Sequence, residues 1–282
     1  MSYLKIENLE IAFNTPKGKF VAVKDINLDI AKGEIVSIIG HSGCGKSTIL
    51  NAISGMLFPT KGTVVLNGKE IKGPGPDRGI VFQNYSLLPW LTVYDNIFQA
   101  VDAALASTPK AEKHALVEKY LKMVNLWEHR EKHPKQISGG MKQRTAIARA
   151  FAINPEVLLL DEPFGALDAL TKSSLHIELL KMWNLTQRSK TIVMVTHDIE
   201  EAVFLSDRIV VMNNGPAATI REIEDVHLPR PRNKKDIINL EEYKITRERL
   251  LSLLMDKVEI DEKDFFIPTP TPKSPKGDLV PS

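Results

Sequence analysis

The chain has 282 residues, which is enough for one large domain or two small ones and for a sizeable hydrophobic core. Its 37 Lys and Arg residues nearly balance its 35 Asp and Glu residues, and a formal charge of +2 argues against a dedicated nucleic-acid binder. The single cysteine, Cys44, excludes an internal disulfide framework and is typical of a reducing compartment, and no apolar run approaches the ~20 residues of a membrane helix.

Two kinds of strand pattern are present in the chain. Residues 4–13, with a phase change near Asn8, and residues 21–30 alternate apolar and polar side chains, which predicts antiparallel strands with one solvated face. A further strand at 63–66 runs into Asn67-Gly68, a pair typical of a two-residue hairpin turn. Continuous apolar runs instead predict buried parallel strands that alternate with helices, and these runs are residues 35–39, 157–160 and 191–195.

Residues 40–47 match the G-x-x-x-x-G-K-[ST] pattern of a phosphate loop, between a buried strand and a helix-like segment. Glycines let such a backbone wrap around a β-phosphate with its N–H groups aimed inward, at the positive end of a helix. Lys46 can reach the β- and γ-phosphates, and the Ser47 hydroxyl can ligate Mg²⁺. The loop predicts a nucleoside triphosphate site, formed by Gly40, His41, Ser42, Gly43, Cys44, Gly45, Lys46, Ser47 and Thr48.

Residues 92–151 show no strand pattern. Leu116, Tyr120 and Val124 form an apolar stripe at four-residue spacing, as on one face of a helix. We therefore predict an α-helical subdomain inserted into an α/β core.

A second candidate anion site begins at Ser138. This serine can cap a helix, and Gly139 and Gly140 expose backbone N–H groups at the positive end of that helix. Because the phosphate loop already holds the triphosphate, the geometry favours a contact between this second site and the γ-phosphate of a partner subunit's nucleotide.

Two carboxylates follow the apolar run at 157–160. Ligands of parallel sheets bind at the carboxyl ends of the strands, so Asp161 is expected to hold Mg²⁺. Glu162 can polarise, as a general base, the water that attacks the γ-phosphate. His197 lies just past another buried strand, where it can hydrogen-bond the γ-phosphate and hold Glu162 and the water in place.

The composition changes after about residue 225. Residues 228–235 combine prolines with basic side chains, and we predict a linker whose basic run, 230–235, is solvated. The pattern of residues 240–258 predicts an amphipathic helix that packs against the core, with a regulatory or docking role as the alternative. We expect a folded domain at 1–225 (its helical subdomain at about 92–151), a linker and helix at 226–267, and a Pro-rich disordered tail at 268–282.

Taken together and in this order, the motifs resemble those of the ABC transporter ATPases over about residues 2–224. The resemblance implies an α/β P-loop NTPase fold, with a RecA-like parallel-sheet core, an antiparallel β subdomain and the inserted helical subdomain. It also implies ATP and Mg²⁺ as cofactors. The residues that it marks are catalytic Lys46, Gln83, Glu162 and His197, Mg²⁺ ligands Ser47, Gln83 and Asp161, and, facing the partner's nucleotide, signature residues Ser138, Gly139, Gly140 and Met141 with Asp168 of the D-loop.

The signature departs from the common family pattern, and the aromatic contact with adenine has two candidates. The usual Leu-Ser-Gly-Gly-Gln signature has Ile137 and Met141 at its ends here, but Ser138 and the two glycines that carry the phosphate contact are present. An aromatic residue usually stacks on adenine in this family. We favour Phe13 for this contact, with Phe20 as the competitor.

Several stretches are similar to the nitrate, sulfonate and taurine import group, and above all to nitrate ATP-binding subunits and their bicarbonate and cyanate relatives; they are residues 73–78, 81–90, 137–144, 162–171 and 214–218. This similarity implies an ATPase that powers uptake of nitrate or nitrite, with bicarbonate, cyanate or an aliphatic sulfonate or taurine as alternatives. It also implies two membrane-spanning permease subunits, a second, longer and non-identical ATPase subunit, an external solute-binding protein and no nucleic acid.

The same similarity implies a peripheral location on the cytoplasmic face of the plasma (inner) membrane, and the first residues show no secretory signal. We interpret residues 85–90 as a groove for the permease, with internal packing as the alternative. A soluble ABC ATPase that acts on nucleic acid or ribosomes is the rival class. It is disfavoured because the chain carries one cassette and no sustained heptads between Lys46 and Ser138.

Overall fold

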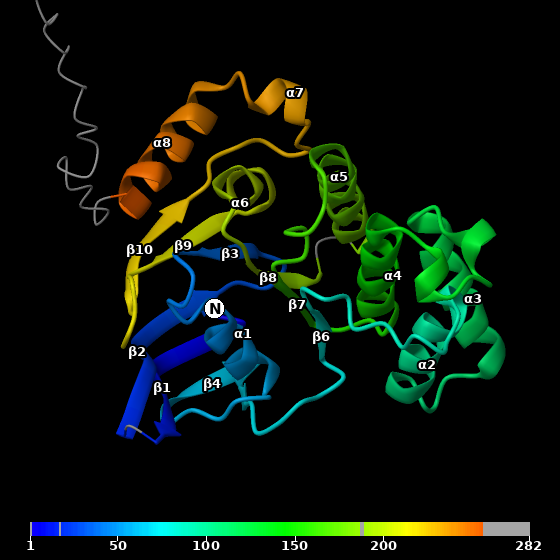
Figure 1. Cartoon of the computed structure of the whole chain (residues 1–282), viewed down its shortest axis with the longest axis horizontal. Coiled ribbons are helices and arrows are strands. Elements are labelled where there is room, and N and C mark those ends of the chain that lie inside the picture. Colours follow the sequence, from blue (N-terminus) through cyan, green and yellow to red (C-terminus); the bar gives the residue numbers. More distant parts are fainter. Residues whose placement is uncertain (1, 17, 187–188, 256–282) are drawn as a thin grey trace, which may run out of the picture.

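The computed structural model describes residues 2–16, 18–186 and 189–255 (Figure 1). In this part, the chain forms a four-stranded sheet of order β2-β1-β4-β5 and a six-stranded sheet of order β10-β9-β3-β8-β7-β6. The strands of the first sheet are β1 (Leu4–Thr15), β2 (Gly18–Ile30), β4 (Lys61–Leu66) and β5 (Lys69–Glu70). Those of the second are β3 (Ile35–Ile39), β6 (Arg78–Val81), β7 (Val157–Asp161), β8 (Thr191–Val195), β9 (Arg208–Met212) and β10 (Ile220–Asp225).

The four-stranded sheet is antiparallel, as its alternating sequence predicts. β1 pairs with β2 on one side and with β4 on the other, and the register shifts beside Asn8, where the alternation changes phase. Asn67 and Gly68 both have positive φ, at 49° and 75°, which is the conformation that a type I′ hairpin turn requires.

In the six-stranded sheet, all neighbouring strands are parallel except β10, which runs antiparallel to β9. Both faces of the sheet are covered, and this explains the uninterrupted apolar runs. In β3, for example, Val36 and Ile38 belong to one core and Ile35 and Ile39 to the other.

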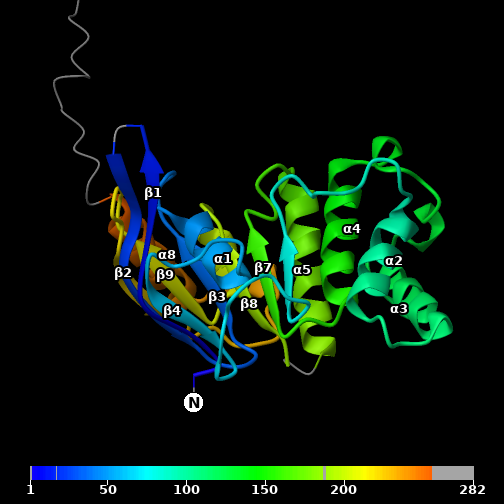
Figure 2. The ribbon, with the colours of Figure 1, turned by 90° about the horizontal axis from the view of Figure 1, so that it is seen from below.

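One core lies between the two sheets and includes α1 (Lys46–Ser54); the other lies on the far face of the six-stranded sheet. Figure 2 shows α1 between the two sheets. Beyond β7 it shows the helices on the other side of the six-stranded sheet. The second core is built with α4 (Gly139–Ala152), α5 (Ala169–Leu185) and α6 (Ile199–Leu205).

Residues 92–151 contain helices and no strand, in agreement with the sequence pattern. α2 (Val93–Ala104) and α3 (Lys110–Met123) pack against each other and against α4, with short 3₁₀ turns at Trp127–His129 and Pro134–Gln136. Tyr120 and Val124 of the predicted stripe are buried, whereas Leu116 is half-buried. None of the helices that the structure describes is long and apolar enough to cross a membrane.

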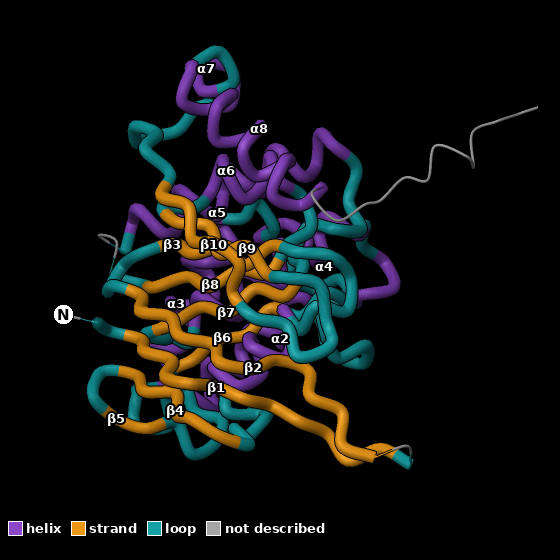
Figure 3. The backbone as a smooth tube through the Cα atoms, turned by 90° about the vertical axis from the view of Figure 1, so that its left-hand side faces the viewer, coloured by secondary structure: helices purple, strands orange, loops and turns teal. Residues whose placement is uncertain are grey.

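The predicted C-terminal helix is α8 (Glu241–Met255), which follows the short α7 (Lys234–Ile237) and packs on α6. Its buried side chains are Tyr243, Thr246 and Leu250. Figure 3 shows α8 beyond β9 and β10, on the side away from the antiparallel sheet. The predicted end of this helix at 258 and the Pro-rich tail at 268–282 lie outside the residues that the structure describes.

The prediction that the basic run 230–235 is solvated is wrong for Arg230 and Arg232. The Arg230 guanidinium pairs with Asp207 at 2.8 Å and stacks over the Trp183 ring, 4.7 Å from its centroid. Arg232 is only 8% exposed, and burial lowers its pKa to about 10, so that it still carries its charge at neutral pH.

The end of α6 explains the position of Arg232. Its Nη1 donates to the carbonyl oxygens of Val203, Phe204 and Ser206, at 3.2, 2.9 and 2.7 Å. The last carbonyls of a helix have no partner within the helix and form the negative end of its dipole. The cation therefore satisfies a helix end that would otherwise be buried without partners.

We expect Arg232→Ala to lower the free energy of unfolding by about 2–4 kcal/mol, because it leaves buried carbonyl groups without donors. Urea unfolding followed by circular dichroism measures this change. Lys235→Ala, in the exposed part of the same run, is the matched control and should shift stability by less than about 0.5 kcal/mol. Equal unfolding midpoints for the two variants would show that Arg232 contributes nothing at the end of α6.

Candidate functional site

The loop between β3 and α1 has a backbone that only glycine fits at Gly45. This residue has a φ of 89°, and a Cβ on it would lie 2.3 Å from Cγ1 of Val23. Lys46 is buried at the start of α1, and its ammonium donates to the carbonyls of Gly40 and His41, at 2.8 and 2.9 Å. The loop thus folds around one cation, at the N-terminus of a helix, and both features favour binding of an anion.

Cys44 lies within this loop, but its thiol is buried. A Cβ on Gly40 would come within 2.7 Å of the Cys44 sulfur, so the two residues are tightly packed. Burial raises the pKa of the Cys44 thiol and opposes formation of the reactive thiolate. Any contact between Cys44 and a phosphate therefore has to come from its backbone.

The carboxyl ends of neighbouring parallel strands bring the predicted catalytic residues together. Ser47 Oγ donates to Asp161 Oδ1 at 2.9 Å, which joins the start of α1 to the end of β7. At the next residue, Glu162 Oε2 accepts a bond of 3.1 Å from Gln83 Nε2, and His197 Nδ1 lies 3.5 Å away from the same oxygen.

Glu162 has an unusual backbone. Its φ is 43°, in the left-handed region that costs a non-glycine residue about 1–3 kcal/mol and that occurs preferentially at functional sites. Its N–H donates to the carbonyl of Val195 at the end of β8, at 2.9 Å. The loop that carries the carboxylate is thus attached to the strand that leads to His197, which fixes the two side chains relative to each other.

The electrostatics at Asp161 favour a cation. Burial raises the pKa of Asp161, the hydrogen bond from Ser47 opposes this effect, and the neighbouring charge of Glu162 adds to it. A cation beside the two carboxylates would remove this penalty. The hydroxyl of Ser47 and the carboxylate of Asp161 are hard oxygen ligands of the kind that Mg²⁺ prefers.

The oxygen donors also fit Mg²⁺ bound together with a nucleotide. No group of three or more His, Cys, Asp or Glu side chains that could hold a metal is present in the described part of the chain. Mg²⁺ commonly keeps several waters and uses one or two protein ligands together with substrate phosphates, so Ser47 and Asp161 suit it. Gln83 lies at the same edge, and its amide nitrogen faces Glu162.

Phe13 and Phe20 are the two candidates for the adenine contact. They are directly paired across the β1–β2 hairpin. Side chains of such a pair lie on the same face of a sheet. Both rings line one pocket with the phosphate loop. The pocket residues are Phe13, Phe20, Ala22, Ser42, Gly43, Gly45, Lys46, Ser47, Thr48 and Glu162.

The signature residues begin α4. Ser138 caps the helix by accepting a bond from the N–H of Met141 at 3.3 Å. Asp168 caps α5 in the same way, through the N–H of Thr171 at 3.0 Å, and this bond lowers the pKa of its carboxyl. Gly140 closely approaches Thr171, because a Cβ on it would lie 2.6 Å from Cγ2 of that residue.

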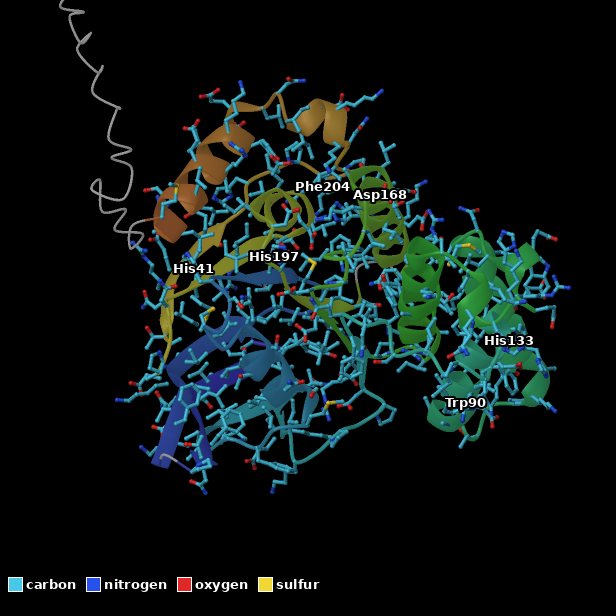
Figure 4. The ribbon with its side chains drawn as sticks, in the orientation of Figure 1. His41, Trp90, His133, Asp168, His197 and Phe204 are labelled. Atoms are coloured by element: carbon cyan, nitrogen blue, oxygen red, sulfur yellow. The ribbon has the colours of Figure 1, made fainter. Side chains whose placement is uncertain are left out.

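The structure brings the signature and the D-loop together, but not onto their own phosphate loop. None of the five residues predicted to contact a partner's nucleotide lines the pocket that contains Lys46; they are Ser138, Gly139, Gly140, Met141 and Asp168. Asp168 and His197 can be located in Figure 4. Ser138 and Asp168, which cap α4 and α5, are both exposed.

The segment 85–90 is partly packed and partly exposed. Tyr85 and Leu87 pack against the core of the helical region, and Arg149 donates to the carbonyl of Tyr85 at 3.0 Å. Trp90, in contrast, is 69% exposed beside α2 (Figure 4). The internal-packing alternative thus describes Tyr85, and the groove interpretation is left with Trp90.

Two contacts near the site have no signal in the sequence. Gly215, on the loop after β9, approaches the phosphate loop, because a Cβ on it would lie 3.3 Å from the carbonyl oxygen of Gly43. Behind His197, Lys172 of α5 pairs with Asp198 at 2.9 Å. Both contacts join residues that are distant in sequence, so spacing along the chain could not reveal them.

Comparisons with known proteins agree with this geometry. Residues 23–165 match the family model described as ABC transporter. The chain is 51% identical over 261 residues to the bicarbonate transport ATP-binding protein CmpD of Synechococcus elongatus, with 93% of each chain covered. It is 49% identical to the nitrate import ATP-binding protein NrtD of the same organism, over 92% of this chain and 94% of that one.

The fold is also similar to a solved structure. A dimeric, post-hydrolysis state of the ATP-binding cassette MJ0796 bound to ADP and Pi superimposes with a TM-score of 0.69 at 33% identity. The match covers 80% of this chain and all of that one, and it extends the similarity from sequence to three-dimensional arrangement.

We expect Glu162→Gln to bind ATP within about threefold of the unaltered chain but to hydrolyse it about 10²–10⁴-fold more slowly, because the amide cannot act as a general base. Phosphate release and binding of a fluorescent ATP analogue measure the two properties. Glu200→Gln, three residues past His197 on α6, is the control and should keep its turnover. Hydrolysis at the original rate in Glu162→Gln would refute the role of Glu162.

Proposed function

The chain belongs to the ABC transporter family as one of its ATPase subunits, and on that premise we propose that it powers the uptake of nitrate or nitrite across the plasma membrane. The observation that carries the ATPase part is the cluster of Ser47, Asp161 and Glu162 at one sheet edge, beside a phosphate loop. The anion rests on the likeness to NrtD, a nitrate import ATP-binding protein.

In the proposed reaction, the phosphate loop and Lys46 hold the triphosphate. Ser47, Asp161 and Gln83 would hold Mg²⁺, which neutralises phosphate charge when bound. Glu162 accepts a proton from the attacking water, and His197 keeps that water and the γ-phosphate aligned. The contacts of Glu162 Oε2 with Gln83 and His197 support this arrangement.

A second ATPase subunit completes the site. The signature residues do not line the pocket that contains Lys46, so we assign the helix N-terminus after Ser138 to the γ-phosphate bound by a partner, together with Asp168. MJ0796, bound to ADP and Pi, is a dimer. The partner in this system is a longer, non-identical ATPase, and the pair sits on two membrane-spanning permease subunits fed by an external solute-binding protein.

Trp90 is the proposed contact with a permease subunit, at the cytoplasmic face of the membrane. An indole with this exposure is an apolar surface that a partner can cover. It follows Gln83 by seven residues, so a movement of the glutamine on hydrolysis can reach it through a short segment.

We expect Trp90→Asp to abolish co-purification with the permease subunits while the isolated chain keeps its ATPase activity. Phe58→Asp, a substitution of a similarly exposed aromatic residue, is the matched control and should leave assembly unchanged. Intact assembly of Trp90→Asp would remove Trp90 from the interface.

Bicarbonate is the second candidate, because CmpD is as similar to the chain as NrtD is. Uptake of labelled nitrate, nitrite, bicarbonate, cyanate and an alkanesulfonate by cells lacking this chain separates the candidates. We expect loss of nitrate and nitrite uptake that is restored by the unaltered chain and not by Lys46→Ala. Loss of bicarbonate uptake alone would select the second candidate, and unchanged uptake of all five anions would rule out the anion-import proposal.

A further inference from the structure

A polar cluster is buried behind the proposed catalytic residues, between α5 and α6. His176 of α5 is 1% exposed, and its Nε2 lies 3.6 Å from Oε2 of Glu201, whose side chain is 2% exposed. Both ring nitrogens of His176 and the Oε1 atom of Glu201 lack a hydrogen-bond partner among the residues that the structure describes. Buried polar groups are costly without partners, so this cluster needs an explanation beyond packing.

Lys172, on the same helix α5 as His176, is a cation beside this cluster. Lys172 Nζ lies 2.9 Å from Asp198 and 3.8 Å from Glu201. Burial alone would raise the pKa of Asp198, but the hydrogen bond and the charge of Lys172 lower it overall. Lys172 is therefore engaged mainly by Asp198, and His176 is the nearer neighbour of Glu201.

His176 also contacts the loop that carries Glu162. The ring of Phe164, two residues after Glu162, packs edge-on against the imidazole at 4.6 Å, and Phe204 of α6 lies 6.0 Å from it. Phe164 is fully buried, and the imidazole forms part of the surroundings that hold its ring in place.

The same imidazole lies against the first turn of α6. Asp198, which follows His197, caps this helix by accepting a bond from the N–H of Glu201 at 3.1 Å. Glu201 lies in the first turn of α6, so the imidazole packed 3.6 Å from its carboxylate limits how this turn, and the His197 loop that leads into it, can shift.

We propose that His176 is a positioning residue for ATP hydrolysis, which sets the distance between the Glu162 loop and the His197 loop by contacting Phe164 on one side and Glu201 on the other. The proposal rests on the proposed roles of Glu162 and His197. His176 touches neither the nucleotide pocket nor the reacting atoms, so it acts only through these neighbours. Its loss should slow turnover and leave ATP binding unchanged.

The test compares His176→Ala, His176→Gln and Leu180→Ala. Leu180 is buried one turn further along α5, in the same core, and serves as the control for a loss of packing alone. We expect kcat to fall at least about tenfold in His176→Ala, with KM for ATP within about twofold. Gln puts a planar amide in place of the imidazole between Phe164 and Glu201, so His176→Gln should return to within about threefold of the original kcat. Leu180→Ala should keep the original kcat while losing thermal stability.

A double variant covers a failure of His176→Ala to fold. His176→Leu with Glu201→Leu removes both polar groups and fills their space, a change that is often neutral or stabilising for a buried pair. We expect it to fold and to hydrolyse ATP at least about tenfold more slowly. An unchanged kcat in either His176→Ala or the double variant would overturn the proposal.

Two controls keep this proposal separate from the proposed function. The unaltered chain must hydrolyse ATP and Glu162→Gln must not, and if either fails, the ATPase assignment falls first. If both hold and the His176 variants are fully active, only the positioning role is lost.

Discussion

The carboxyl ends of β3, β7 and β8 lie side by side at one edge of the sheet, and the rest of the site depends on this alignment. Asp161 pairs in register with Val195, and Ile38 pairs with the same residue from the other side. Three chain segments therefore leave the sheet at nearly one level, namely the phosphate loop, the Glu162 loop and the His197 loop. Hydrogen bonding between buried parallel strands thus keeps these three loops adjacent, although they are spread over more than 150 residues of sequence.

Burial on both faces makes this alignment rigid. The strands β3, β7, β8 and β9 send alternate residues into two different cores, so a one-residue slip would exchange the side chains that fill them. The helices α4, α5 and α6, which cover the second core, begin at the side-chain caps Ser138, Asp168 and Asp198. Fold stability and site geometry are thus consequences of the same packing.

The sequence is sufficient to predict the parts of this protein that depend on local chemistry. The phosphate loop, the Asp161-Glu162 pair and the buried strands each follow from residue type and spacing, and the family resemblance added Gln83 and Asp168. The features that the sequence could not predict depend on contacts between segments that are distant along the chain. Arg232 reads as a solvated charge until the end of α6 is placed beside it, and Phe13 and Phe20 read as rivals until their strands pair. His176 reads as one more helical side chain, because nothing near it in sequence shows that Glu201 and Phe164 face it.

The attachment of Arg230 and Arg232 to α6 has a consequence for anyone who shortens or fuses this chain. A fragment that stops after β10 keeps every recognisable motif, yet it removes both guanidinium groups from the helix that begins beside His197. Such a fragment would expose the Trp183 ring and leave the end of α6 bare, although its sequence looks complete. The practical unit for expression, grafting or subunit exchange therefore includes the segment up to α8, and motif boundaries alone are a poor guide to where this polypeptide can be cut.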